Sequence, residues 1–165
     1  MIFRDEQPAD IPHIARIVTA AFETAPFSDR TEAAIVDGLR NARALAISLV
    51  AVDGGELVGH VVFSPVTIGG VDLGWFGLGP VAVRPNRQGS GIGQALVRAG
   101  LARLIALGAK GSVVLGEPEY YGRFGFRVHS GLWLADVPST HFMALTFGDE
   151  PPSGQARYHA AFSSS

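Results

Sequence analysis

The chain has 165 residues, of which 47% are hydrophobic and 17% charged, with a formal net charge of −2 at pH 7. This length and composition predict one globular domain over residues 1–162, followed by a frayed tail at residues 163–165. The absence of cysteine excludes disulfides, thiolate metal sites and a cysteine acyl-enzyme. No apolar run is long enough to span a membrane and the first residues do not form a signal peptide, so we expect a cytoplasmic protein.

Helices come before strands in the first part of the chain. The residue pattern predicts a helix that begins after Asp10 and a second helix over residues 31–40. Strands are predicted over residues 44–52 and 57–68. The glycine-containing segment at residues 53–56 predicts that these two strands form a hairpin.

A further strand begins near Trp75 and contains the pair Gly79-Pro80. Proline cannot donate a ladder hydrogen bond and glycine permits a bulge, so pairing to the neighbouring strand is expected to fail at this pair. A sheet that separates at one strand opens a wedge between two strands. An ordinary bulge at a sheet edge is the alternative interpretation of the same residues.

The most informative segment is the apolar strand at residues 81–83 together with the glycine-rich turn and helix start that follow it. Three glycines at residues 89–93 let the backbone approach a ligand, and the first N–H groups of a helix have no intrahelical partners. The stretch from Arg84 to Gly116 also holds five cations and neither Asp nor Glu. These features predict a site for an anion such as a pyrophosphate. A turn that only starts a helix is the alternative.

Other glycine-loop chemistries do not fit this segment. A Walker loop requires Gly-Lys followed by Ser or Thr, but Gly91 and Gly93 are followed by Ile92 and Gln94. A dinucleotide fold requires Gly-x-Gly-x-x-Gly at its first strand and an acid about twenty residues later. This loop lies in mid-chain, and the next acid is Glu117. The sequence therefore argues against nucleoside triphosphates, nicotinamides and flavins.

The second half of the chain is expected to complete the sheet. A buried strand over residues 112–115 precedes a short helix that starts at Glu117. Residues 126–129 and 142–147 are predicted to form a closing pair of strands. A loop is expected at residues 149–154.

Two segments resemble motifs of the GCN5-related N-acetyltransferase (GNAT) superfamily. Residues 88–93 read Gln-Gly-Ser-Gly-Ile-Gly and match the superfamily signature Gln/Arg-x-x-Gly-x-Gly/Ala. Residues 121–126 read Tyr-Gly-Arg-Phe-Gly-Phe and match its Tyr-x-x-x-Gly-Phe segment. Residues 58–65, 78–83 and 158–162 also resemble the YhbS-like branch of the superfamily, so the resemblance spans nearly the whole chain.

The resemblance implies an α/β GNAT fold, which is a mixed, twisted sheet split at a central strand with helices on both faces. It also implies transfer of acetyl from acetyl-CoA to a primary amine. No metal is expected, because the histidines show no metal-binding pattern. In the superfamily the pantetheine arm pairs with the freed strand and the pyrophosphate lies on the loop. The cofactor-binding residues on this basis are Val81, Ala82, Val83, Gln88, Gly89, Ser90, Gly91, Ile92, Gly93 and Gln94.

Acyl transfer from a thioester requires a neutral amine, hydrogen-bond donors for the carbonyl oxygen and a proton for the departing thiolate. The backbone N–H groups of Val81 and Val83 are the expected donors. Tyr121 matches the tyrosine that many superfamily members place near the CoA sulfur, so the resemblance implies that it is the general acid. Tyr120 is the lesser candidate. The alternative for Tyr121 is a core tyrosine whose hydroxyl bonds elsewhere.

The general base is not indicated by a motif. Many superfamily members carry a glutamate on the strand before the loop, but the corresponding strand here has none. Glu117, at the end of the strand that flanks the wedge, is expected to be the base, with Glu23 and Glu32 as less favoured acids. His60 lies in an apolar strand and is expected to be a core residue rather than a base.

The acceptor is predicted to be a small-molecule amine. Residues 20–39 carry four acids and one cation, which favours a cationic amine, although a solvated acidic helix face explains the same charges. A protein N-terminus or lysine is the alternative acceptor, and a non-catalytic CoA-binding module is the alternative of another class. Neither nucleic acid nor a membrane is an expected partner, since no aromatic-basic stripe is present. The oligomeric state stays open, with a homodimer as one alternative.

Overall fold

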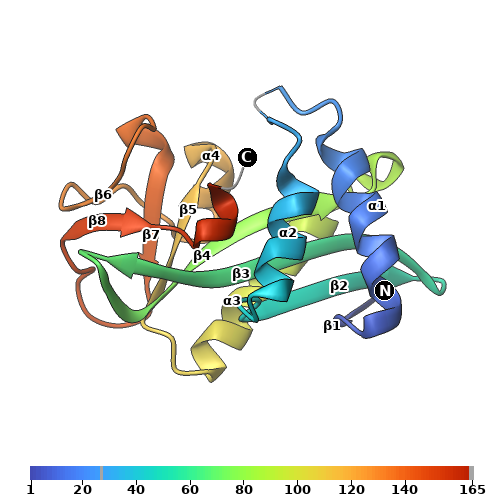
Figure 1. Ribbon diagram of the computed structural model, residues 1–165, viewed down its shortest axis with the longest axis horizontal. Coiled ribbons are helices and arrows are strands. Elements are labelled where there is room, and N and C mark those ends of the chain that lie inside the picture. The colour runs from blue at the N-terminus through green and yellow to red at the C-terminus, as the bar shows by residue number, and fades with distance from the viewer. Residues whose placement is uncertain (27, 164–165) are drawn as a thin grey trace.

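The computed structural model describes residues 1–26 and 28–163, and its centre is a mixed β-sheet (Figure 1). The strands in this part of the chain are β1 (Ile2–Asp5), β2 (Ile47–Asp53), β3 (Glu56–Ile68), β4 (Val71–Val83), β5 (Gly111–Leu115), β6 (Leu132–Leu134), β7 (Phe142–Thr146) and β8 (Gly154–Arg157). The sheet order is β1-β2-β3-β4-β5-β7, and β8 pairs with both β3 and β6. Most neighbouring strands are antiparallel, but β4 and β5 are parallel, as are β6 and β8. The sheet is therefore mixed, as predicted.

Helices cover both faces of the sheet, which confirms the predicted fold class (Figure 1). They are α1 (Ile11–Phe22), α2 (Glu32–Asn41), α3 (Ile92–Ala106) and the short α4 (Pro118–Gly122). α1 packs on β3 and β4 with α2 beside it, whereas α3 packs on β2 and β3 from the opposite face. Successive strand residues point to opposite faces. Leu49 accordingly joins the core under α3, and Val50 joins the core under α1 and α2.

The β2–β3 hairpin forms at the predicted place. Gly54 and Gly55 make its two-residue turn with φ angles of +58° and +83°. Such angles suit the twist of a hairpin and are readily adopted by glycine. β2 begins at Ile47, later than predicted, because the amide of Ala44 still donates to the carbonyl of Leu39 and closes the end of α2.

The sheet separates along β4, as the pair Gly79-Pro80 predicts. β4 pairs with β5 from Trp75 to Gly77, and no pair with β5 follows Gly77. β4 nevertheless continues beside β3 as far as Val83, with an irregularity opposite Gly79 and Pro80. The last part of β4 therefore has a neighbour on one edge and a gap on the other.

One of the predictions for the second half of the chain is wrong. Residues 126–129 form a single bridge, between Arg127 and Ala144, rather than a strand. The chain leaves the edge of β7 after this bridge and turns, with the Leu132 amide bonded to the His129 carbonyl. β7 instead pairs along its length with β5. The loop expected at residues 149–154 is present as far as residue 153, and Gly154 begins β8, a strand of four residues that carries too short a pattern to be recognised.

The expected tail at residues 163–165 lies outside the described residues except for Ser163. No helix in residues 1–26 or 28–163 has the length and apolar character needed to cross a membrane.

Candidate active site

The glycine-rich turn after β4 forms one wall of a small cavity. Gly89 and Gly91 have φ angles of +80° and +87°, which side chains other than glycine rarely adopt. A Cβ at either position would point into open space rather than into protein. The cavity has a volume of about 210 Å³ and is bounded by Val83, residues 87–89 and 91–94, and Tyr120.

The first backbone N–H groups of α3 lie at this cavity without intrahelical partners. Gly91 precedes the helix, and the first amide bond back to it comes from Ala95. The N–H groups of Ile92, Gly93 and Gln94 therefore remain as donors at the positive end of a helix of fifteen residues. The unpaired amides, the positive end of the helix dipole and the absence of side chains at Gly89 and Gly91 together make a site suited to a phosphate-like anion.

The free edge of β4 lies next to this loop. The amide of Arg84 donates to the carbonyl of Val58 on β3 at 2.8 Å. Because peptide groups alternate in direction along a strand, Val83 and Val81 turn theirs away from β3, toward the gap left by β5. The Gln88 side-chain amide donates to the Val83 carbonyl at 3.1 Å, which ties the loop to this edge. Ala82 differs from its neighbours, since its side chain is in the core under α1 and α2.

A second cavity, of about 390 Å³, lies where β4 and β5 separate. Its wall includes β4 at residues 79–81 and the side chains of Glu32, Tyr121 and Tyr158. The remaining wall is apolar and consists of Phe22, Ile35, Leu78, Leu115, Leu134 and Phe162. The two cavities thus adjoin the same end of β4, one at Val81 and the other at Val83.

Tyr121 is held rigidly on α4 at the wall of the second cavity. Its ring packs edge to face against Phe126, with centroids 6.1 Å apart, and against Tyr120, with centroids 4.9 Å apart. Burial raises the pKa of Tyr121 to about 12, and Tyr120 acts in the same direction. Burial also raises the pKa of Tyr158, with Tyr121 adding to the shift. Both phenols are therefore protonated at neutral pH and can act as hydrogen-bond donors.

Tyr120 lies at the first cavity rather than at the second. A Cβ on Gly93 would come within 3.3 Å of the Tyr120 hydroxyl, so this tyrosine faces the start of α3. The guanidinium of Arg123 lies 4.6 Å from the centre of the Tyr120 ring. Sequence analysis missed Tyr120 as a residue that lines this cavity. Its position next to the Tyr-x-x-x-Gly-Phe segment is the local signal for it.

Glu117 is two residues after Leu115, which lines the second cavity, but Glu117 itself does not line it. It precedes the first residue of α4, its side chain makes no hydrogen bond that caps the helix, and that side chain is 72% exposed. Its carboxylate oxygen lies 3.7 Å from Nε2 of His141. Glu32, the less favoured acid, does line the cavity.

The five cations between Arg84 and Gly116 do not gather at the loop, which corrects the expectation drawn from their sequence spacing. Three of them form ion pairs with acids from other segments: Arg84 with Glu56 at 3.5 Å, Arg87 with Asp53 at 2.6 Å, and Arg103 with Asp5 at 2.8 Å. Arg98 lies over the ring of Phe124. Among the residues that the structure describes, Arg87 is the one member of the five that lines the loop cavity. Backbone amides, rather than a concentration of cations, characterise the site.

His60 is a core residue, as expected. Its ring is fully buried, with Nε2 2.8 Å from the hydroxyl of Ser48. That hydroxyl also lies 2.5 Å from a carboxylate oxygen of Glu6, so it donates to Glu6 and accepts from His60. Burial lowers the pKa of His60 against the opposing effect of Glu6. In the described part of the chain, no three His, Asp or Glu side chains are grouped so that they could hold a metal ion.

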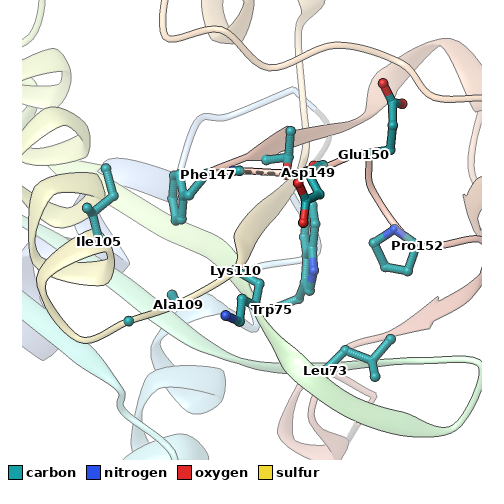
Figure 2. Close-up of a pocket in the computed structure, with 12 residues that line it drawn as sticks. Leu73, Trp75, Ile105, Ala109, Lys110, Phe147, Asp149, Glu150 and Pro152 are labelled. Carbon is teal, nitrogen blue, oxygen red and sulfur yellow. Dashed lines mark hydrogen bonds between the residues drawn. The ribbon is translucent and has the colours of Figure 1, made fainter.

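A third cavity, of about 520 Å³, lies elsewhere in the sheet, where β4 and β5 are still paired (Figure 2). Its lining includes Trp75, Lys110 and Phe147 together with the acids Asp149 and Glu150 (Figure 2). It contains none of the predicted site residues. The arrangement suited to acyl transfer is therefore at the other end of β4.

Comparison with known proteins agrees with this arrangement. A family model described as an acetyltransferase (GNAT) domain matches residues 3–129. Over 129 residues the chain is 41% identical to the N-acetyltransferase YhbS of Escherichia coli K12, which covers 78% of this chain and 74% of YhbS. The crystal structure of E. coli YhbS in complex with CoA has a TM-score of 0.91 at 34% identity, covering 99% of this chain and 92% of that one. A GNAT family acetyltransferase from Brucella melitensis, solved in complex with acetyl-CoA, has a TM-score of 0.88 at 47% identity, covering 98% and 97%. With this fold, this site and these relatives, the chain belongs to the GNAT family of acetyltransferases.

Proposed function

We propose that this enzyme transfers acetyl from acetyl-CoA directly to a primary amine of a small molecule. The observation that carries the proposal is the unpaired end of β4, which has an anion-binding helix start on one side and a cavity with a buried phenol on the other. An acyl donor with a phosphate-containing arm needs both features within reach of each other. The complexes of similar proteins with acetyl-CoA and CoA support the same donor.

The residues present fit such a donor. The N–H groups of Ile92, Gly93 and Gln94 would hold the pyrophosphate, at a cradle that side chains on Gly89 or Gly91 would fill. The outward peptide groups of Val81 and Val83 would pair with the amides of the pantetheine arm, as an added strand would. Gln88 and Ser90 support the loop through hydrogen bonds to the Val83 and Arg87 carbonyls. Ala82 contributes through packing of the strand.

Acetyl-CoA supplies an acetyl group activated as a thioester. The transfer forms a bond from the amine nitrogen to the acetyl carbon and breaks the bond from that carbon to sulfur. An N–H of Val81 or Val83 stabilises the carbonyl oxygen as it gains charge. Tyr121 is the proposed general acid for sulfur. Its pKa of about 12 lies above the ordinary thiol value of about 8.5, so proton transfer from Tyr121 to the thiolate is uphill and is drawn forward when solvent re-protonates the phenol.

The amine must also lose a proton before or during the attack. Glu117 is the proposed base. Its carboxylate is mostly exposed and outside the cavity wall, so it would take the proton through an intervening water. Tyr121 later regains its proton from solvent and Glu117 releases to solvent the proton that it accepted, which returns the enzyme to its starting state.

A small acceptor is favoured over a protein amine by the size of the second cavity, about 390 Å³, which lies in the range of small-molecule sites. A protein N-terminus or lysine is the second candidate, and a CoA-binding module without catalysis is the third. A cytoplasmic location and a homodimeric state remain predictions.

The proposal is tested by measuring CoA thiol release from acetyl-CoA with a panel of primary amines. Release that depends on both amine and enzyme is the expected result. Mass spectrometry of a metabolite extract incubated with enzyme and acetyl-CoA identifies acceptors outside the panel, and an acetyl-lysine or acetylated N-terminus readout detects protein modification. Binding of acetyl-CoA without acetylation of any amine would leave only the CoA-binding module.

A further inference from the structure

We propose that the acceptor is a primary monoamine with an apolar or aromatic body and no carboxylate, and that Glu32 binds its ammonium group. This inference rests on the proposed acetyl transfer and adds the chemical class of the substrate. It is carried by the wall of the cavity where β4 and β5 separate, which combines one carboxylate with an otherwise apolar or phenolic surface.

Glu32 lines this cavity and has no cationic partner among the residues that the structure describes. It is the first residue of α2, and both of its carboxylate oxygens lie near the hydroxyl of Ser28, at 2.7 and 2.8 Å. A hydroxyl has one proton to donate, so the carboxylate keeps capacity for further donors. Within residues 1–26 and 28–163, no Lys, Arg or His forms an ion pair with it. A carboxylate beside an apolar wall is partly removed from water, so a cation that contacts it stabilises its charge.

The rest of the wall selects the body of the substrate. Leu115 comes from the end of β5 and Leu134 from β6, whereas Phe22 and Ile35 come from α1 and α2. An apolar or aromatic group placed among them would be removed from water on several sides, which favours binding in proportion to its area.

The wall also excludes other amines. None of the described residues that line this cavity is Lys, Arg or His, so the carboxylate of an amino acid would lose water without gaining a partner. A polyamine would place its second and third charges against apolar side chains, since Glu32 is the one acid among those lining residues. Amino acids and polyamines are therefore expected to be poor acceptors.

Matched acceptors test the substrate class. 2-Phenylethylamine and phenylalanine differ by one carboxylate, and spermidine carries several ammonium groups on an aliphatic chain. At saturating acetyl-CoA, we expect kcat/KM for 2-phenylethylamine to exceed that for phenylalanine and for spermidine at least tenfold. Equal or better rates with phenylalanine or spermidine would overturn the inference and leave acetyl transfer intact. If no amine in the panel releases thiol, the proposed function itself fails.

A binding measurement distinguishes loss of the Glu32 charge from a general disturbance of the fold. In calorimetry without turnover, Glu32→Gln should weaken binding of 2-phenylethylamine about tenfold and leave that of 2-phenylethanol, its uncharged analogue, within twofold. Leu115→Ser should weaken both ligands, because it removes part of the apolar wall at a side chain that is 43% exposed. Glu23→Gln, which removes an acid that does not line this cavity, is the matched control and should change neither. Equal effects of Glu32→Gln on the amine and the alcohol, or none on either, would contradict an ammonium contact.

Discussion

The ring of Tyr121 occupies the space that a side chain at Gly116 would fill. A Cβ built on Gly116 would overlap the edge of this ring, so the glycine after β5 determines where the phenol lies. Gly116→Ala should therefore move the hydroxyl away from its place at the cavity, and a displacement near 1 Å at a catalytic group can cost on the order of tenfold or more in turnover. The measurement is kcat under saturating substrates, together with the affinity for acetyl-CoA, which should change little.

The control for this substitution is Gly122→Ala, because Gly122 lies on the same short helix as Tyr121 and a Cβ there meets nothing within 4 Å. In a double-mutant cycle, Gly116→Ala should cost little more once Tyr121 is already phenylalanine. Fully additive losses would mean that Gly116 acts through another group.

Replacing Tyr121 by phenylalanine removes the proposed acid and keeps the ring contacts with Phe126. Turnover should fall by on the order of 10²-fold, as for other positioned acids, with acetyl-CoA affinity nearly unchanged. Tyr120→Phe should lose far less turnover, and its effect should fall on acetyl-CoA affinity because its hydroxyl faces the start of α3. Single-turnover chemistry at parental speed in Tyr121→Phe would limit this tyrosine to packing.

Gly91→Val should abolish binding of CoA while the fold persists. The valine would have to adopt the φ of +87° and would project into the loop cavity. Calorimetry with CoA measures the loss, and circular dichroism checks the fold. Gly70→Val is the matched control, since Gly70 has a φ of +78° and open space around it in the turn between β3 and β4. CoA affinity preserved in Gly91→Val would rule out this loop as the anion site.

Glu117→Gln tests the proposed base. If this carboxylate accepts the proton of the amine, the rate of the variant should fall most at low pH, where the amine is most protonated, with CoA affinity intact. His141→Ala is a useful companion, because His141 lies 3.7 Å from the carboxylate and its loss should alter the pH profile only if Glu117 acts. A pH–rate profile equal to that of the parent enzyme would show that Glu117 is not the base.

Glu6→Gln should reduce stability and alter its dependence on pH. Burial raises the pKa of the Glu6 carboxyl, but contacts with His60, Arg40 and Ser48 outweigh burial and hold that pKa well below its ordinary value. A group with a depressed folded pKa contributes stability that is present above its unfolded pKa, here 4.5, and is lost as the pH falls through its folded pKa.

For Glu6→Gln we therefore expect about 2 to 3 kcal/mol of destabilisation at pH 7, as for a mostly buried ion pair that loses one partner, and a smaller difference from the parent in acid. Urea unfolding at several pH values measures this. Asp37→Asn removes the exposed partner of the same Arg40 and should cost less than about 1 kcal/mol. An equal cost at pH 7 and pH 3 would show that the charge of Glu6 does not contribute.

Local patterns determined much of this protein. The break at Gly79-Pro80, the glycine turn and the start of α3 could all be predicted, because backbone conformation there depends on the neighbouring residues themselves. The β2–β3 hairpin was predictable for the same reason. Short strands such as β1 and β8 were not, since four residues carry too little periodicity and their pairing depends on distant strands.

Only the tertiary structure decided which side chains meet at the site. The wall of the second cavity, where β4 and β5 separate, combines Glu32 from α2, Tyr121 from α4 and Tyr158 from beyond β8. These three residues are far apart in the sequence, and no spacing pattern links them. The cations between Arg84 and Gly116 were expected to favour an anion at the glycine turn. In the structure, however, Arg87 forms an ion pair with Asp53 from the β2–β3 hairpin. Glu117 lies two residues after the end of β5, but it does not line the cavity between β4 and β5, whereas Glu32 does. The packing of α1 and α2 on the sheet, rather than the order of residues in the chain, places Glu32 there.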